Sequence, residues 1–222
     1  MCFSANASFG AGIVLSAIGV AAIRKVQHKS QIPFAVIPLI FAVQQITEGF
    51  LWLSLPDPVK STTSHTLTII FLIFAQVVWP LYVPLSILFL EKKGTRKNTQ
   101  KILAGLGALV SLYLGYCLSN YAVQAQITGH HVEYIRKYPP TFQNAVAVFY
   151  IISIIAPSFF SHIKRMWMLG VTIIISAAIT ELFYENYFVS VWCFFASLLS
   201  LSVYMVMLEI QEPIAKIQNP IV

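Results

Sequence analysis

Charged side chains are scarce in this chain. Only 10% of its 222 residues are Asp, Glu, Lys or Arg and 58% are hydrophobic, whereas soluble domains carry about 25% charged residues. The mean hydropathy is +0.77. So little polar surface excludes a soluble globular protein of this length, and no segment between the apolar runs is long enough to form a soluble domain. The sequence therefore predicts an integral membrane protein.

Several familiar motifs are also missing. The chain contains no P-loop, no G-x-G-x-x-G, no nucleophile elbow, and none of the H-E-x-x-H, H-x-x-x-H or C-x-x-C spacings. The last apolar run holds no lysine that could carry a retinal Schiff base. Basic residues lie in short loops rather than in one patch, so no nucleic-acid partner is expected.

Apolar windows recur along the whole sequence. A transmembrane helix needs about 20 apolar residues, and seven windows of this kind are present: 7–25, 33–55, 65–90, 100–123, 141–160, 166–184 and 187–208. They predict an all-α, seven-helix transmembrane domain that occupies residues 1–222 as one unit, with a tail at 209–222. Pro80 and Pro84 predict a kink in the third window. Small residues in "GLGALVSLYLG" (105–115) predict close helix contact in the fourth.

The basic residues are distributed unevenly over the predicted loops. If the windows alternate in direction, one side holds eleven Lys and Arg residues and the other holds only three, Lys60, Arg136 and Lys137. Because cytoplasmic loops are enriched in Lys and Arg, the N-terminus is predicted outside and the C-terminus in the cytoplasm. The first window lacks a preceding basic region, which argues against a cleaved signal peptide.

Two glutamates lie inside apolar windows in similar local sequences, "QQITEGF" (44–50) and "AAITELF" (177–183). An ionisable side chain within a span costs several kcal/mol unless it is paired, so it indicates a functional site. Glu48 and Glu181 each lie 15 residues after the predicted start of their helix, at the same predicted depth. This correspondence predicts a parallel repeat of three helices, one connecting helix and three helices, which is a known transporter arrangement.

A polar stripe surrounds the first of these glutamates. Gln44, Gln45, Glu48 and Trp52 share one face of a helix, and that face must point into the bundle. Histidine, cysteine and carboxylate side chains suit zinc, copper or iron. The predicted metal ligands, all on the outer side of the predicted topology, are Cys2, Glu48, His65, His130, His131 and Glu181. The alternative is a carboxyl group that is hydrogen-bonded to its neighbours and serves packing.

The longest outer connection, residues 124–141, is polar and aromatic and is expected to fold over the outer mouth of the bundle. The three cysteines, Cys2, Cys117 and Cys193, also fall on the outer side. Two of them could form a disulfide there, or they could serve as small core residues.

Several short motifs resemble a family of small, uncharacterised bacterial multi-pass membrane proteins that begin Met-Cys-(Phe/Trp)-Ser-Ala. The motifs are "MCFSA", "QQ…EGFLW", "FAQVVWPLYVP", "HHVEY" and "FVSVWCFF", and they extend over nearly the whole chain. The positions that the resemblance marks are Cys2, Ser4, Glu48, Trp52, Trp79, Pro80, His130, Tyr134, Trp192 and Cys193. The resemblance implies a membrane location and no particular activity, and it does not include Glu181.

The main functional hypothesis is a membrane-embedded enzyme, metal-dependent or not, in the bacterial inner membrane. Its outward-facing site would be centred on Glu48, with His130 and Tyr134 as the other catalytic residues, and it would act on a lipid or a small apolar molecule. The first alternative is a small proton- or cation-coupled transporter of the semi-symmetric seven-helix type, with prolines as hinges. The second is a receptor or accessory subunit that uses residues 124–141 as its contact surface.

Overall fold

The structure, a computed structural model, describes residues 4–92, 94–184 and 195–218. Its α-helices are α1 (Ala5–Ile23), α2 (Ile32–Ala35), α3 (Ile37–Ser54), α4 (Ser61–Leu72), α5 (Trp79–Leu90), α6 (Thr95–Asn120), α7 (Gln143–Phe159), α8 (Met166–Tyr184) and α10 (Ala196–Gln218). Short 3-10 helices, η1 (Lys29–Gln31), η2 (Pro58–Lys60) and η4 (Pro140–Phe142), precede α2, α4 and α7. A π-helix, η3 (Ile73–Val78), joins α4 to α5. Two antiparallel strands, β1 (Val123–Thr128) and β2 (His131–Arg136), follow α6.

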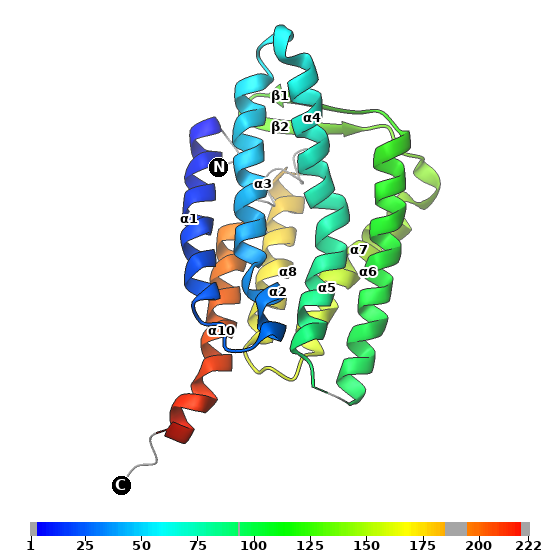
Figure 1. The fold of residues 1–222 in the computed structure, drawn as a ribbon. Coiled ribbons are helices and arrows are strands. Elements are labelled where there is room, and N and C mark those ends of the chain that lie inside the picture. The colour runs from blue at the N-terminus through cyan, green and yellow to red at the C-terminus, as the bar shows by residue number, and fades with distance from the viewer. Residues whose placement is uncertain (1–3, 93, 185–194, 219–222) are drawn as a thin grey trace.

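The helices form one bundle, and the β-hairpin lies across one of its ends (Figure 1). We call this the hairpin end; the loops after α1, α5 and α7 lie at the opposite end. α1 packs mainly on α3 and α10, whereas α6 and α7 pack on α5 and on each other. In the described part of the chain, five helical segments are long and apolar enough to cross a membrane: Ala5–Ile23, Lys29–Ser54, Pro58–Leu90, Thr95–Asn120 and Pro140–Phe159. α8 and α10 contain shorter apolar stretches, and together these helices indicate a membrane protein.

The observed elements correct the predicted architecture in one place. The fold is mostly helical, but the connection at 124–141 contains a hairpin, so the all-α prediction was incomplete. The predicted tail at 209–222 begins as a continuation of α10, which extends to Gln218, and its location outside the membrane stays a prediction. This continuation begins with Glu, Ile and Gln at 209–211, which are compatible with helix. Residues 187–194 of the seventh window lie outside the described residues, and the parallel repeat and the orientation in a membrane stay predictions.

The irregular third window has a clear cause in its prolines. Pro80 has no backbone N–H, so the preceding turn loses a helical donor and widens into the π-helix. Two carbonyl groups of this turn accept side-chain donors instead: the Tyr150 hydroxyl bonds Ala75 O at 2.6 Å and the Ser111 hydroxyl bonds Val77 O at 2.7 Å. The predicted kink is therefore a π-helix that neighbouring helices satisfy.

α6 approaches α5 very closely next to this turn. A Cβ atom added at Gly107 would lie 1.9 Å from the Pro80 carbonyl oxygen, so only glycine fits there. That carbonyl would bond the N–H of residue 84 in a regular helix, and Pro84 has none. The glycine-rich stretch of α6 thus serves close packing, as its small residues predict.

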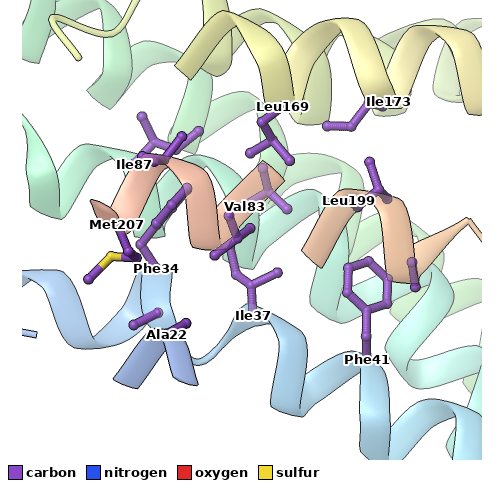
Figure 2. Close-up of a cluster of buried hydrophobic side chains, with 14 of the residues drawn as sticks. Ala22, Phe34, Ile37, Phe41, Val83, Ile87, Leu169, Ile173, Leu199 and Met207 are labelled. Atoms are coloured by element: carbon purple, nitrogen blue, oxygen red, sulfur yellow. The ribbon is translucent and has the colours of Figure 1, made fainter. Parts of the chain in front are cut away.

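The main hydrophobic core lies in the middle of the bundle and extends toward the opposite end. Phe34, Ile87 and Met207 are completely buried there. Figure 2 shows that side chains from α2, α3, α5, α8 and α10 point into this shared core. A second cluster, which includes Phe71, Leu118 and Tyr134, lies under the hairpin and fixes it on the bundle.

Candidate functional site

The polar stripe of α3 points into the bundle, as its helical spacing predicts. Glu48 has an exposed fraction of 0%, Gln44 of 0% and Gln45 of 1%. Removing such groups from water is costly unless other groups bond them. The hydrogen-bond partners of this stripe therefore show how the hairpin end satisfies its buried polar groups.

Gln44 is held by the start of α5. The Trp79 indole N–H donates to Gln44 Oε1 at 2.8 Å, and the Trp79 ring stacks on Phe41 with centroids 3.8 Å apart. Trp79 follows the π-helix directly, so the widened turn and Pro80 determine where the indole lies. The amide of Gln44 is thereby fixed one helical turn from Glu48.

Tyr134 on β2 contacts Glu48 from the hairpin end of the bundle. In the hairpin, Thr128 pairs with His131, and Gly129 takes a positive φ of 62°, which two-residue hairpin turns require. Side chains of a strand alternate between its faces, and Val132 and Tyr134 point into the bundle. The Tyr134 ring stacks on Phe71 with centroids 4.7 Å apart, and its hydroxyl lies 3.4 Å from Glu48 Oε1, a long hydrogen bond.

Gln76 belongs to the π-helix and is bonded on one side. The Tyr138 hydroxyl donates to Gln76 Oε1 at 2.7 Å, and burial raises the pKa of Tyr138 to about 12. Gln76 is 4% exposed, and its Nε2 has no hydrogen-bond partner among the described residues. A buried amide with one satisfied and one unsatisfied end is unusual and calls for an explanation.

Gln76 belongs to the lining of a large cavity. The cavity has a volume of about 990 Å³ and is lined by η3, α5, α6, α7, α8 and β2, with single residues from α3 and α10. Its inner walls are apolar and continue into the core through Phe41, Val83, Ile173 and Leu199, which Figure 2 shows near one another. Its polar lining includes Gln76, Tyr134, Arg136, Tyr138, Gln143, Tyr150 and Glu181. This mixture of apolar walls and a few polar groups is typical of small-molecule sites.

Arg136 ends β2 and lies in the lining of this cavity. Arg136 is exposed to solvent over part of its side chain, and the rest is buried against protein atoms. This burial lowers the pKa of the Arg136 guanidinium, although an arginine still carries its charge at neutral pH. Within the described residues no carboxylate forms an ion pair with Arg136. The cavity therefore has a cationic group available at its hairpin end.

The structure brings together only some of the predicted site residues. Glu48 and Tyr134 are neighbours, but His130 is exposed in the turn of the hairpin and forms no hydrogen bond with Glu48. Glu181 is exposed and lines the large cavity, so the two glutamates of the predicted repeat have different surroundings. His131 is half-buried on β2, where burial, with a smaller contribution from the charge of His130, lowers its pKa.

His65 lies apart from the other predicted ligands. It lines a second cavity of about 810 Å³ between α4, η3, α6 and β1. Across residues 4–92, 94–184 and 195–218, no three His, Cys, Asp or Glu side chains gather closely enough to hold a metal ion. Cys2 and Cys193 lie outside the described residues, and Cys117 is a buried free thiol on α6. The zinc, copper or iron site stays a prediction.

Several polar residues of the cavity lining were not among the predicted site residues, including Gln76, Arg136 and Tyr138. A signal for one of them, Arg136, was present in the sequence. "VQAQIT" and "HVEYIR" alternate apolar and polar residues around Gly129, which is the pattern of a hairpin. A hairpin at this position places Tyr134 and Arg136 on the same strand face, whereas a loop places neither.

The apolar helices indicate a helical membrane protein, and its interior contains an enclosed carboxyl group and an amphipathic cavity. The chain belongs to DUF6629, a family of unknown function, whose model matches residues 1–217. This membership confirms the resemblance to an uncharacterised family. No curated protein and no solved structure shows a significant match to the chain.

Proposed function

We propose that this protein is a membrane-embedded enzyme that binds a lipid or small apolar molecule in the 990 Å³ cavity and transfers a proton through Tyr134 and Glu48. One observation carries the proposal. Tyr134 lines the cavity, and its hydroxyl lies 3.4 Å from the fully buried carboxyl group of Glu48. A titratable group beside a ligand cavity, but shielded from water, is what general acid–base catalysis requires.

The proposed proton path has two steps. A proton from the bound molecule passes to the Tyr134 oxygen while the phenolic proton of Tyr134 passes to Glu48 Oε1. The reverse transfer returns the proton to the product. Their separation of 3.4 Å is long for a hydrogen bond, and catalytic hydrogen bonds commonly shorten when substrate binds. Trp79 and Gln44 hold α3 and α5 in register, so the carboxyl group stays directed at the hairpin.

The location follows from the charge distribution. We place the protein in the bacterial inner membrane with its N-terminus and its hairpin end outside. The loops at the opposite end contain most of the Lys and Arg residues, which favours the cytoplasm for that end. The cavity then opens near the outer surface of the membrane.

A metal-dependent form of the enzyme is a distinct version of this proposal. Glu48 would then be a ligand, and zinc, copper or iron would polarise the substrate. Elemental analysis of the purified full chain tests it: stoichiometric metal that disappears in Glu48→Ala supports the metal, and metal-free protein that still converts its substrate contradicts it.

A proton- or cation-coupled transporter is the second candidate. The observation in its favour is that two helices are interrupted, one between α2 and α3 and one at the π-helix, which lines the cavity. Interrupted helices line the binding sites of many transporters. Flux of the identified ligand across proteoliposomes, abolished by Glu48→Gln, would favour this candidate over the enzyme.

Filling the cavity tests whether it binds a ligand. Ala177 on α8 lines the cavity, so Ala177→Phe should displace a bound apolar molecule. Ala17 is exposed on α1, far from the cavity lining, and Ala17→Phe is the matched control. Native mass spectrometry and lipid extraction of the full chain in mild detergent should find a co-purified molecule in wild type and in Ala17→Phe, but less of it in Ala177→Phe. Equal content in all three proteins contradicts the proposal.

A further inference from the structure

The polar lining of the large cavity indicates more about the ligand than the size of the cavity does. This inference rests on the proposed binding of an apolar molecule in that cavity, and it concerns the chemical group that such a molecule carries. The relevant side chains are Arg136, Gln76 and Glu181, none of which enters the proposed proton path.

Arg136 provides a charge that the described protein does not neutralise. Arg136 lies in the cavity lining and is partly exposed, it forms no ion pair with a described carboxylate, and the burial of the rest of its side chain lowers its pKa. A cation in such surroundings is stabilised when an anion joins it, and a guanidinium matches carboxylate and phosphate oxygens with two parallel hydrogen bonds.

Gln76 provides an independent, buried donor in the same lining. Its Oε1 accepts the Tyr138 hydroxyl at 2.7 Å, which fixes the orientation of the amide, and its Nε2 has no partner among the described residues. Gln100 Oε1 and Ser158 Oγ are also buried without partners, but neither residue lines either of the two cavities. Only donors that border the cavity can be satisfied by a ligand, and the Arg136 guanidinium and the Gln76 amide both need an oxygen acceptor.

Glu181 limits the charge of that acceptor. Its carboxylate lines the same cavity from α8, so it disfavours a group with two negative charges more than a group with one. A carboxylate or a phosphodiester fits this requirement better than a phosphomonoester does.

We propose that the cavity binds an amphiphile whose singly charged oxygen group, a carboxylate or a phosphodiester, bonds Arg136 and Gln76 while its apolar chain lies against Phe41, Val83, Ile173 and Leu199. The carboxylate would come from a fatty acid, and the phosphodiester from a phospholipid. Both place the charged group at the hairpin end and the chain in the core.

Matched pairs of amphiphiles test the head group. Oleate is compared with oleyl alcohol, and dioleoylphosphatidylglycerol with dioleoylglycerol, each titrated by native mass spectrometry into the delipidated full chain in detergent. We expect wild type to prefer the charged member of at least one pair by about tenfold, the range for a charge-assisted hydrogen bond. The pair that shows the preference identifies the source of the charge.

Arg136→Gln should remove this preference and leave binding of the uncharged member unchanged. Lys137→Gln is the matched control, because Lys137 has the same charge, is the next residue and does not line the cavity. Arg136→Lys keeps the charge without the planar fork and should retain part of the preference, which keeps the test informative if Arg136→Gln fails to fold.

The outcomes separate this inference from the proposed function. A wild-type protein that binds both members of each pair equally, or a Lys137→Gln loss as large as that of Arg136→Gln, overturns the head-group assignment. If no amphiphile binds wild type and Ala177→Phe has the same lipid content as Ala17→Phe, the cavity is not a ligand site and the proposed function fails.

Discussion

The two ends of the bundle both bury glutamate, but they use it differently. At the opposite end, Glu91 closes α5 and is 4% exposed. Its Oε1 accepts the Ser161 hydroxyl at 2.5 Å and the His162 backbone N–H at 3.0 Å, and its Oε2 lies 2.7 Å from His162 Nδ1. Every acceptor oxygen of Glu91 is therefore used by the loop between α7 and α8.

Glu209 holds the same loop from its other side. Its carboxylate oxygens accept the backbone N–H groups of Lys164 and Arg165 at 3.2 and 2.6 Å. The two acids together satisfy the backbone of a loop that has no regular structure. They are structural groups: Glu91 follows the last residue of α5 and Glu209 lies within α10, and both contact the same loop.

The hairpin end differs because its polar groups border a cavity. Among the described residues, Gln76 has an unbonded amide nitrogen in the cavity lining, Arg136 has no ion pair, and the contact from Tyr134 to Glu48 is long. A buried acid is therefore weak evidence of function until its partners are known. The difference between satisfied and available hydrogen-bonding groups separates the structural end from the candidate site.

The largest expected effect is a loss of stability at the opposite end. Glu91→Ala removes the shared acceptor of the partly buried Ser161 hydroxyl and His162 N–H, so the free energy of unfolding should fall by about 2 kcal/mol. Thermal unfolding in detergent, followed by circular dichroism, measures it. Glu133→Ala is the control, because Glu133 bonds Gln126 and Thr128 on the hairpin and is only half-buried. Ligand content should not change, and a wild-type melting temperature would show that Glu91 is not structural.

The second prediction concerns the acid at the hairpin end. Glu48→Gln keeps the size of the side chain and an oxygen that can accept the Tyr134 hydroxyl, so stability should change by about 1 kcal/mol or less. Conversion of the co-purified ligand should fall by about 100-fold, the lower range for loss of a general base. Tyr134→Phe should give a similar loss with unchanged ligand binding. If Glu48→Gln lowered the stability as much as Glu91→Ala and left the conversion of the ligand intact, Glu48 would be a structural group like Glu91.

Much of the helical fold could be predicted from the sequence, because length and hydropathy alone mark most apolar helices. The inward direction of the stripe from Gln44 to Trp52 follows from helical spacing in the same way. The β-hairpin was missed because its short strands lie in a polar connection, where the apolar windows give no signal. The prolines of the third window predicted an irregular turn, but the donors from α6 and α7 that bond the carbonyl groups of the π-helix are distant in sequence, so no local pattern shows them.

The candidate site was predicted only around Glu48. His65 and His130 were grouped with it by their predicted depth, but depth along a bundle does not determine the lateral position of a side chain. The structure places His65 beside the second cavity and His130 in an exposed turn. Arg136 was counted only as a loop charge, because its position in the cavity lining depends on the pairing register of β1 and β2.

A third prediction compares two buried glutamines. Gln76→Leu removes the unbonded amide nitrogen but leaves the Tyr138 hydroxyl without its acceptor, so stability should change by about 1 kcal/mol or less. The preference for a charged amphiphile should fall about threefold, as one neutral hydrogen bond allows. Gln100→Leu is the control: it removes a 2.8 Å bond from Nε2 to Pro157 O between α6 and α7 and should lower stability without altering ligand preference. If Gln100→Leu lost the preference for a charged amphiphile instead, a structural glutamine outside the cavity would affect the ligand as much as one in its lining, and the distinction between the two ends would fail.

The smallest effect is expected at high pH. The pKa of Tyr138 is about 12 in the folded protein because burial disfavours the phenolate, against 10.0 for the ordinary side chain. The folded state thus retains this proton after the unfolded state has lost it, so the stabilisation is complete below pH 10 and declines as the pH rises from about 10 to about 12. Other tyrosines add to the decline in wild type, and Tyr138→Phe should remove only the part that belongs to Tyr138.

Melting temperatures at pH 9 and pH 11.5 measure this contribution of Tyr138, with Tyr116→Phe on the exposed face of α6 as control. If the melting temperature of Tyr138→Phe falls between pH 9 and pH 11.5 as steeply as that of wild type and of the control, the Tyr138 hydroxyl is not held in a buried contact with Gln76. The polar end of the cavity is then more open to water than its hydrogen bonds indicate.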